Sequence, residues 1–231
     1  MRTGSDKHRA AVVTWAIPTQ SAGQNPWWLA MILCALLGAM AAFLLLVGPF
    51  DQAAVRRLVR ASAQTSVLLF STAFVASSLA AFFPGVTTRW LLRHRRQVGV
   101  SFAFSHAIHL LALVLLADFF PHPFIDDLSL LGLVGGGTSY GFIFVMAATS
   151  NDRAVAWLGP RRWHLLHLIG GWTIWVIFLQ SYLPLALLDP RYAPLGLLVI
   201  AAAAMRAGSV VRRRMSPKNE TTGDPKCAQP S

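Results

Sequence analysis

Long apolar stretches recur along this 231-residue chain, separated by short polar segments. A helix needs about 20 mostly apolar residues to cross the hydrocarbon core of a bilayer, and each stretch is long enough to do so. The pattern therefore predicts an all-α integral membrane protein, a bundle of six transmembrane helices joined by short loops. The six stretches cover approximately residues 27–49, 62–84, 98–120, 128–148, 163–185 and 192–211.

Composition agrees with this interpretation. Hydrophobic residues make up 55% of the chain and charged residues only 13%, whereas soluble domains carry about 25% charged residues. We expect one membrane domain over 27–211, a cytoplasmic segment over 1–26 and a basic, disordered cytoplasmic tail over 212–231. The polar segment before Trp27 has no apolar core or cleavage site of a removable signal peptide. Cys34 in the first span and Cys227 in the tail are not expected to form a disulfide.

The positive charges are concentrated in the segments at one end of the predicted bundle. Cytoplasmic segments tend to carry the excess of Lys and Arg, and this rule places both termini in the cytoplasm of a bacterial cell, with the bundle in the inner membrane. The net charge of +11 then indicates orientation rather than nucleic-acid binding. On the outer side the basic residues are Arg56, Arg57, Arg60 and Arg191. The three arginines of the first outer loop are the one departure from the rule.

Histidine is the only ionisable residue type deep in the apolar stretches. Transporters driven by protons or sodium usually keep an acid or a lysine near the bilayer midplane, and these spans hold none away from their ends. Two pairs of histidines, His106 with His109 and His164 with His167, are spaced so that both members share one helix face. Neutral imidazole is an axial ligand of haem iron. The third and fifth spans could therefore hold a haem b between them.

Depth along the helices limits which histidines could meet at one iron. At about 1.5 Å per residue, His167 lies roughly 8 Å beyond Arg162, whereas His106 and His109 lie roughly 15 and 20 Å beyond Arg96. Helix tilt can absorb several ångströms. This count leaves open whether His106 or His109 pairs with His167.

Other residues near the histidines fit a porphyrin but have plainer explanations. Gly170 and Gly171 would leave room for a flat ring, as would the glycines of the fourth span, although small residues also favour helix packing in membranes. Arg95, Arg96 and Arg162 could pair with haem propionates, or simply anchor the topology. His164 follows Trp163 and could be interfacial rather than a ligand. His106 could simply form hydrogen bonds between helices.

Two segments resemble signatures of the ferric reductase-like transmembrane family. The segment RRQVGVSFAFSHAIH, residues 95–109, resembles its arginine-pair, glycine, aromatic and histidine motif, and TSNDRAVAWLGPRRWHLLH, residues 149–167, resembles its Thr-Ser, Leu-Gly and Trp-x-x-Leu-His motif. The resemblance covers approximately residues 30–190. It is closest to the branch of haem-binding membrane subunits of the bacterial periplasmic methionine sulfoxide reductase system.

The resemblance implies a six-helix cytochrome b. The third-span ligand falls on His109 and the first fifth-span ligand on His167. The family usually has a further histidine thirteen residues later, where this chain has Gln180. Amide groups do not replace imidazole as strong iron ligands, so one haem is expected and two are possible if His106 or His164 compensates.

The sequence thus predicts a haem b-binding membrane electron-transfer subunit, the electron-carrying component of an oxidoreductase system. Relatives that carry flavin and nicotinamide domains have a glycine-rich phosphate loop after a strand, and no such pattern occurs here. Electrons would come from quinol or a separate flavin reductase and pass to a periplasmic redox partner. Two alternatives are a cofactor-free membrane scaffold or transport protein, and a reductase acting directly on external metal ions.

Overall fold

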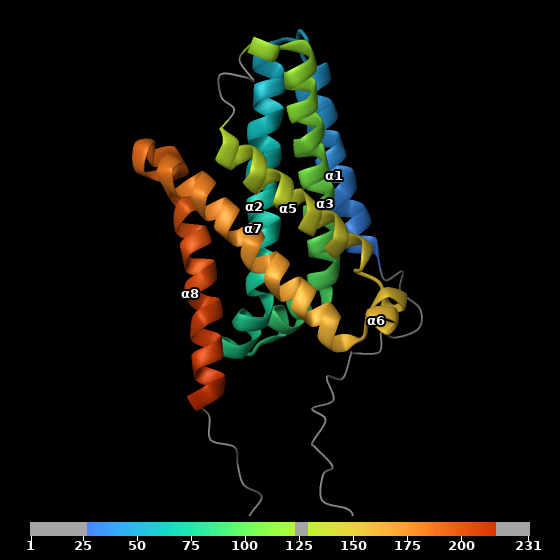
Figure 1. Ribbon diagram of the computed structural model, residues 1–231, viewed down its shortest axis with the longest axis vertical. Coiled ribbons are helices and arrows are strands. Elements are labelled where there is room, and N and C mark those ends of the chain that lie inside the picture. The colour runs from blue at the N-terminus through green and yellow to red at the C-terminus, as the bar shows by residue number, and fades with distance from the viewer. Residues whose placement is uncertain (1–26, 123–128, 216–231) are drawn as a thin grey trace, which may run out of the picture.

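A computed structural model describes residues 27–122 and 129–215 of the chain, and long helices dominate it (Figure 1). The predictions for residues 1–26 and for the tail beyond 215 lie outside the described residues. The elements are α1 (Trp28–Leu46), α2 (Gln52–Phe82), α3 (Val86–Phe119), α5 (Leu130–Ala148), α6 (Asp152–Leu158), α7 (Pro160–Leu188), the short 3₁₀ helix η1 (Pro190–Tyr192) and α8 (Ala193–Met215).

The prediction of an all-helical membrane protein is confirmed at this level. Within the described residues, five helices are long and apolar enough to cross a membrane. The fourth apolar stretch forms α5, and α6 continues it at an angle of 105°, so the pair makes a sixth span if both are counted together. Large apolar side chains are exposed all along the bundle, as expected for surfaces that contact lipid. The start of α1 and the end of α8 lie at the same end of the molecule (Figure 1).

Two helices extend well beyond the apolar stretches that predicted them. Helix α2 begins ten residues before the predicted span, because Asp51 caps it by accepting a hydrogen bond of 2.7 Å from the Ala54 backbone. The first-loop arginines therefore lie on a helix, and the expectation of a loop there is wrong. Helix α3 likewise begins at Val86, so that Arg95 and Arg96 are helical. The apolar pattern of the sequence stops at the membrane boundary. Arginine, alanine and leucine still favour helix beyond that boundary.

The centre of the bundle is helix α2, which packs along α3 and also contacts α1 and α8. Helices α1, α2 and α3 run side by side along the long axis, and α7 crosses them obliquely (Figure 1). An aromatic cluster fills the interior between α2, α3 and α7. Its largest members are Phe70, Phe74, Phe102, Phe178 and Tyr182.

Polar side chains join helices that are distant in sequence. The Gln97 side chain of α3 accepts hydrogen bonds from the Leu29 and Ala30 backbones at the start of α1 (3.1 and 3.3 Å). The hydroxyls of Ser78 and Ser209 lie 3.0 Å apart between α2 and α8. Interhelical hydrogen bonds of this kind add stability in the bilayer, where no water competes for the groups.

The one arginine within an apolar stretch of α8 is also satisfied by α2. The Arg206 guanidinium donates to the Phe74 carbonyl at 2.8 Å and lies 4.3 Å from the centre of the Phe74 ring. The side chain turns into the bundle rather than along the helix toward the membrane surface. A carbonyl and an aromatic face together offset part of the cost of placing the charge there.

Candidate functional site

Among the predicted ligands, His109 faces α2 from α3. Its Nδ1 lies 3.1 Å from the Val59 carbonyl oxygen and 3.1 Å from the Ser62 hydroxyl. A carbonyl can only accept, so Nδ1 carries the proton and Nε2 keeps its lone pair. Ser62 in turn donates to the Leu58 carbonyl at 2.7 Å. Metal-binding histidines are commonly held in this way, by a second partner that fixes the tautomer and the ring.

One turn earlier on α3, His106 lies among aromatic rings. Its ring centre is 5.3 Å from that of His109, 4.8 Å from Tyr140 on α5 and 5.9 Å from Phe178 on α7. Two polar atoms of this group, His106 Nδ1 and Tyr140 Oη, are buried and have no hydrogen-bond partner among the residues that the structure describes. An unsatisfied buried polar group costs about 1–3 kcal/mol. The cluster of His106, His109 and Tyr140 therefore has unused capacity for a ligand.

The same face of α3 carries a row of polar residues that was not predicted from the sequence. Every fourth residue along it is polar, and all but the last are almost fully buried: Gln97, Ser101, Ser105 and His109. The Ser105 hydroxyl lies 2.9 Å from that of Thr65 and 3.0 Å from that of Ser66 on α2. The i, i+4 recurrence was visible in the sequence, but serine alone is common in membrane helices as a packing residue.

The fifth-span histidines differ from the α3 pair. The Nδ1 of His167 lies 3.1 Å from the Trp163 carbonyl, one turn earlier, and the two rings stack 4.1 Å apart. His94 makes the same arrangement with Trp90, at 2.8 Å and 4.4 Å. His94 lies in a basic segment and is not a predicted ligand. The shared geometry therefore reflects the local Trp-x-x-x-His spacing and does not by itself indicate a metal site. His164 is exposed.

The structure brings His106 and His109 together, but His167 lies at another level. His106 contacts Tyr140 on α5, whereas His167 hydrogen-bonds to the backbone of Met146, six residues along the same helix. That difference is about 9 Å along α5. Phe178, which also contacts His106, follows His167 by eleven residues, about 16 Å along α7. Two imidazoles on one metal ion need ring nitrogens about 4 Å apart, since each bond is about 2 Å.

Only some of the glycines expected to admit a porphyrin face protein side chains. Three of them pack against a neighbouring helix: Gly170 against Met146 and Phe142, Gly171 against Phe74, and Gly135 against Ile177. A side chain added at Gly136, Gly137 or Gly141 would meet open space. The arrangement at the first three is what close helix packing in membranes produces.

The predicted propionate partners stand at the end of the bundle where α6 lies. Arg96 forms an ion pair of 2.8 Å with Asp152, which joins α3 to α6. Arg95 and Arg162 are exposed. Among the described residues, no group of three or more His, Cys, Asp or Glu side chains could hold a metal ion directly. A reductase of external metal ions would need a metal site in the loop after the third span. In that loop His122 is exposed, and the neighbouring Asp126 and Asp127 lie outside the described residues.

No protein-family model, curated protein or solved structure matches the chain. The likeness to ferric reductase-like proteins therefore rests on the two motifs that end at His109 and His167.

Proposed function

We propose that this chain is a haem b-binding membrane protein that carries electrons across the bilayer. The observation that carries the proposal is His109, whose Nδ1 is held by the Val59 carbonyl so that Nε2 is available to a ligand. The unsatisfied atoms of His106 and Tyr140 lie in the same cluster. The motif that resembles the ferric reductase-like family ends at this histidine.

The candidate ligands meet some of the requirements for binding haem b and not others. His109 meets the requirements of an axial ligand, and bound haem would supply one-electron chemistry at its iron. His109 and His167 lie at different depths in the bundle, so they cannot both bind one iron. We therefore propose His109 as the principal ligand, with His106 as its rival. An iron bound by His167 would belong to a separate site. Val59 and Ser62 orient His109, and the Phe102 and Phe178 rings lie against the neighbouring His106.

The bundle would lie in the bacterial inner membrane with six spans and both termini in the cytoplasm. The excess of arginines at the α6 end and the shared end of α1 and α8 support this orientation. Quinol or a soluble flavin reductase would then supply electrons, and a periplasmic redox partner would receive them.

The test is the haem content of purified single variants. We expect His109→Ala to lose most of the haem that the parent binds, and His94→Ala to keep it all. His94 is the matched control, because it repeats the local geometry of His167 with its Trp-x-x-x-His pairing. His167→Ala then separates one site from two: full haem content would leave His109 in the sole site, and half the content would indicate two. If His106→Ala alone loses the haem, His109 is not the ligand.

A second candidate function is a cofactor-free scaffold or transport protein. The close packing of Gly170 against Met146 and Phe142 favours it, since these side chains occupy the space expected for a flat ring. Colourless membranes from cells that overproduce the chain with added haem precursor would support this candidate and contradict the first.

A further inference from the structure

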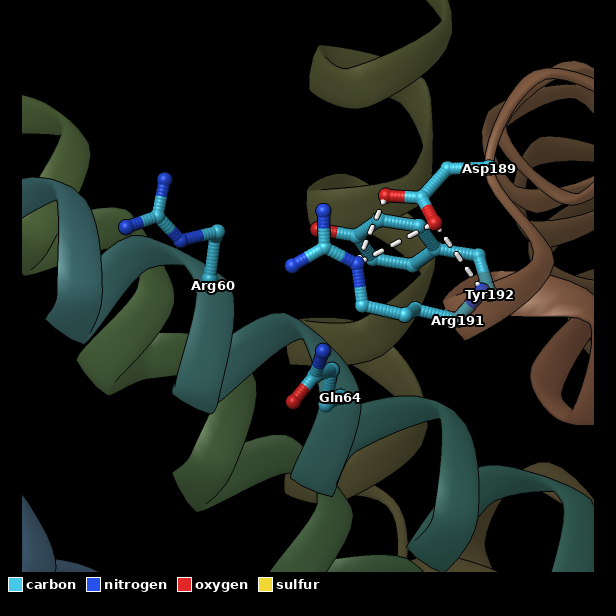
Figure 2. Close-up of a pocket in the computed structure, with 5 residues that line it drawn as sticks. All are labelled: Arg60, Gln64, Asp189, Arg191 and Tyr192. Atoms are coloured by element: carbon cyan, nitrogen blue, oxygen red, sulfur yellow. Dashed lines mark hydrogen bonds and ion pairs between the residues drawn. The ribbon is translucent and has the colours of Figure 1, made fainter.

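A polar cavity of about 450 Å³ opens at the end of the bundle opposite α6, where the α7–α8 connection lies beside α2 (Figures 1 and 2). Five polar residues line it: Arg60, Gln64, Asp189, Arg191 and Tyr192. None of them belongs to the histidine cluster. Two arginines and one aspartate leave these residues with an excess of one positive charge.

The carboxylate of the cavity is already engaged by a neighbour. Asp189 accepts a hydrogen bond from the Arg191 backbone at 3.0 Å, and the Arg191 Nε lies 3.2 Å from both of its carboxylate oxygens. The Arg191 backbone N–H first, and then its guanidinium, hold the pKa of the Asp189 carboxyl below its ordinary value. Because Nε is used in this way, the terminal nitrogens of Arg191 are left for the cavity, and Figure 2 shows them extending over Gln64 toward Arg60.

The second arginine stands on the facing wall. Arg60 and Gln64 lie one turn apart on α2, so both side chains border the same space. In Figure 2 the Arg60 guanidinium turns away from that of Arg191, as expected of like charges. Arg60 is exposed and its long side chain can rotate toward the cavity. An anion placed between the two guanidinium groups would attract both.

The chemistry of the lining selects the anion. Guanidinium groups donate paired hydrogen bonds that match phosphate oxygens, and the Gln64 amide and the Tyr192 hydroxyl add further donors. Directly beside Asp189, Leu187 and Leu188 are 79% and 84% exposed. Apolar side chains exposed next to a basic cavity suit a ligand that has both a phosphate and acyl chains. Free phosphate would use only the polar part.

We propose that this cavity binds the phosphate group of an anionic phospholipid, with Arg60 and Arg191 as the two cationic contacts. In the orientation inferred above, the cavity faces the outer leaflet. The proposal then explains why arginines occur on the side of the membrane where the positive-inside rule expects few. It does not depend on haem binding.

The experiment is a lipid titration of the purified full chain in a neutral detergent at about 0.15 M salt, where charges more than about 8 Å apart are largely screened, and binding is measured by native mass spectrometry. The probes are phosphatidylglycerol, phosphatidylcholine and inorganic phosphate. We expect phosphatidylglycerol to bind the parent at least about tenfold more tightly than it binds Arg60→Gln or Arg191→Gln, since each loses a charge-assisted hydrogen bond. Both side chains are exposed, so these variants should fold normally, and a circular dichroism spectrum checks this.

Arg57→Gln is the matched control, because Arg57 is an exposed arginine one turn earlier on α2 that does not line the cavity. It should change the affinity by less than about twofold, as screened surface charges do. If inorganic phosphate alone binds with the same dependence on Arg60 and Arg191, and phosphatidylglycerol adds nothing, the ligand is a free phosphate. Equal affinity for phosphatidylglycerol and phosphatidylcholine in every variant, or an equal loss in Arg57→Gln, would overturn the proposal.

Discussion

Gln97 of α3 caps a helix to which it does not belong, and this contact makes a measurable prediction. The residue that precedes α1, Trp27, carries an indole, which donates hydrogen bonds but does not accept them, so its side chain cannot supply the capping acceptor. The Gln97 oxygen replaces it, lying 3.1 Å from the Leu29 nitrogen and 3.3 Å from the Ala30 nitrogen. Helix N-termini leave their first backbone N–H groups unpaired, so a cap from another helix joins α1 to α3.

The substitution Gln97→Met keeps the length of the side chain and removes the acceptor. Ala30 is only 5% exposed, so its N–H would be left without water as well as without Gln97. Leu29 is half-buried and its N–H can regain water in part. One buried N–H costs about 1–3 kcal/mol and a lost cap about 0.5–2 kcal/mol. We expect a loss of about 2 kcal/mol, or about 30-fold in the unfolding equilibrium.

The assay is reversible unfolding in mixed micelles, followed by tryptophan fluorescence while the fraction of denaturing detergent is raised. Gln97→Glu is the control, since its carboxylate keeps the acceptor and places a negative charge at the positive end of α1. Burying the carboxylate has a cost of its own, so this variant should unfold between Gln97→Met and the parent. If Gln97→Met unfolds at the same detergent fraction as the parent, or if both variants are equally destabilised, the capping argument is wrong.

Three substitutions elsewhere in the bundle should differ in how much they lower the free energy of unfolding. Gly170→Ala places a methyl group against the Met146 sulfur and should destabilise the chain by about 1–3 kcal/mol, whereas Gly136→Ala meets open space and should be neutral in the same unfolding assay. Equal effects would contradict the packing argument. Arg96→Gln breaks the ion pair with Asp152, whose side chain is 82% exposed, and should cost less than about 1 kcal/mol; a larger loss would show that α6 depends on it.

The hydrophobic pattern predicted the helices well but not their ends. Each apolar stretch lies in a helix, because the bilayer leaves the backbone little alternative. The extension of α2 to Gln52 depends on the Asp51 cap and on helix propensity, which hydropathy does not report. The break after α5 depends on side chains too: Asn151 caps α6 through the Ala154 nitrogen at 2.8 Å, and so starts a helix in a new direction.

The candidate site was predicted residue by residue but not as an assembly. The sequence identified His106 and His109 as neighbours, and their spacing on one helix is enough to explain that. It did not identify Tyr140, because a tyrosine in an apolar helix is not a signal of its own. The count of residues indicated that His167 lies at a different depth from His106 and His109. Whether helix tilt removes that difference could not be predicted, since it depends on the oblique path of α7, which arises from packing between distant helices (Figure 1).

The central claim is that this bundle binds haem b. Its most direct test is the visible spectrum of the purified chain, reduced with dithionite minus oxidised, after expression with added haem precursor. The account predicts the sharp absorption bands of a b-type cytochrome, at about one haem per chain by the pyridine haemochrome assay, and their loss in His109→Ala. A parent protein that is folded but shows no such bands would contradict the claim.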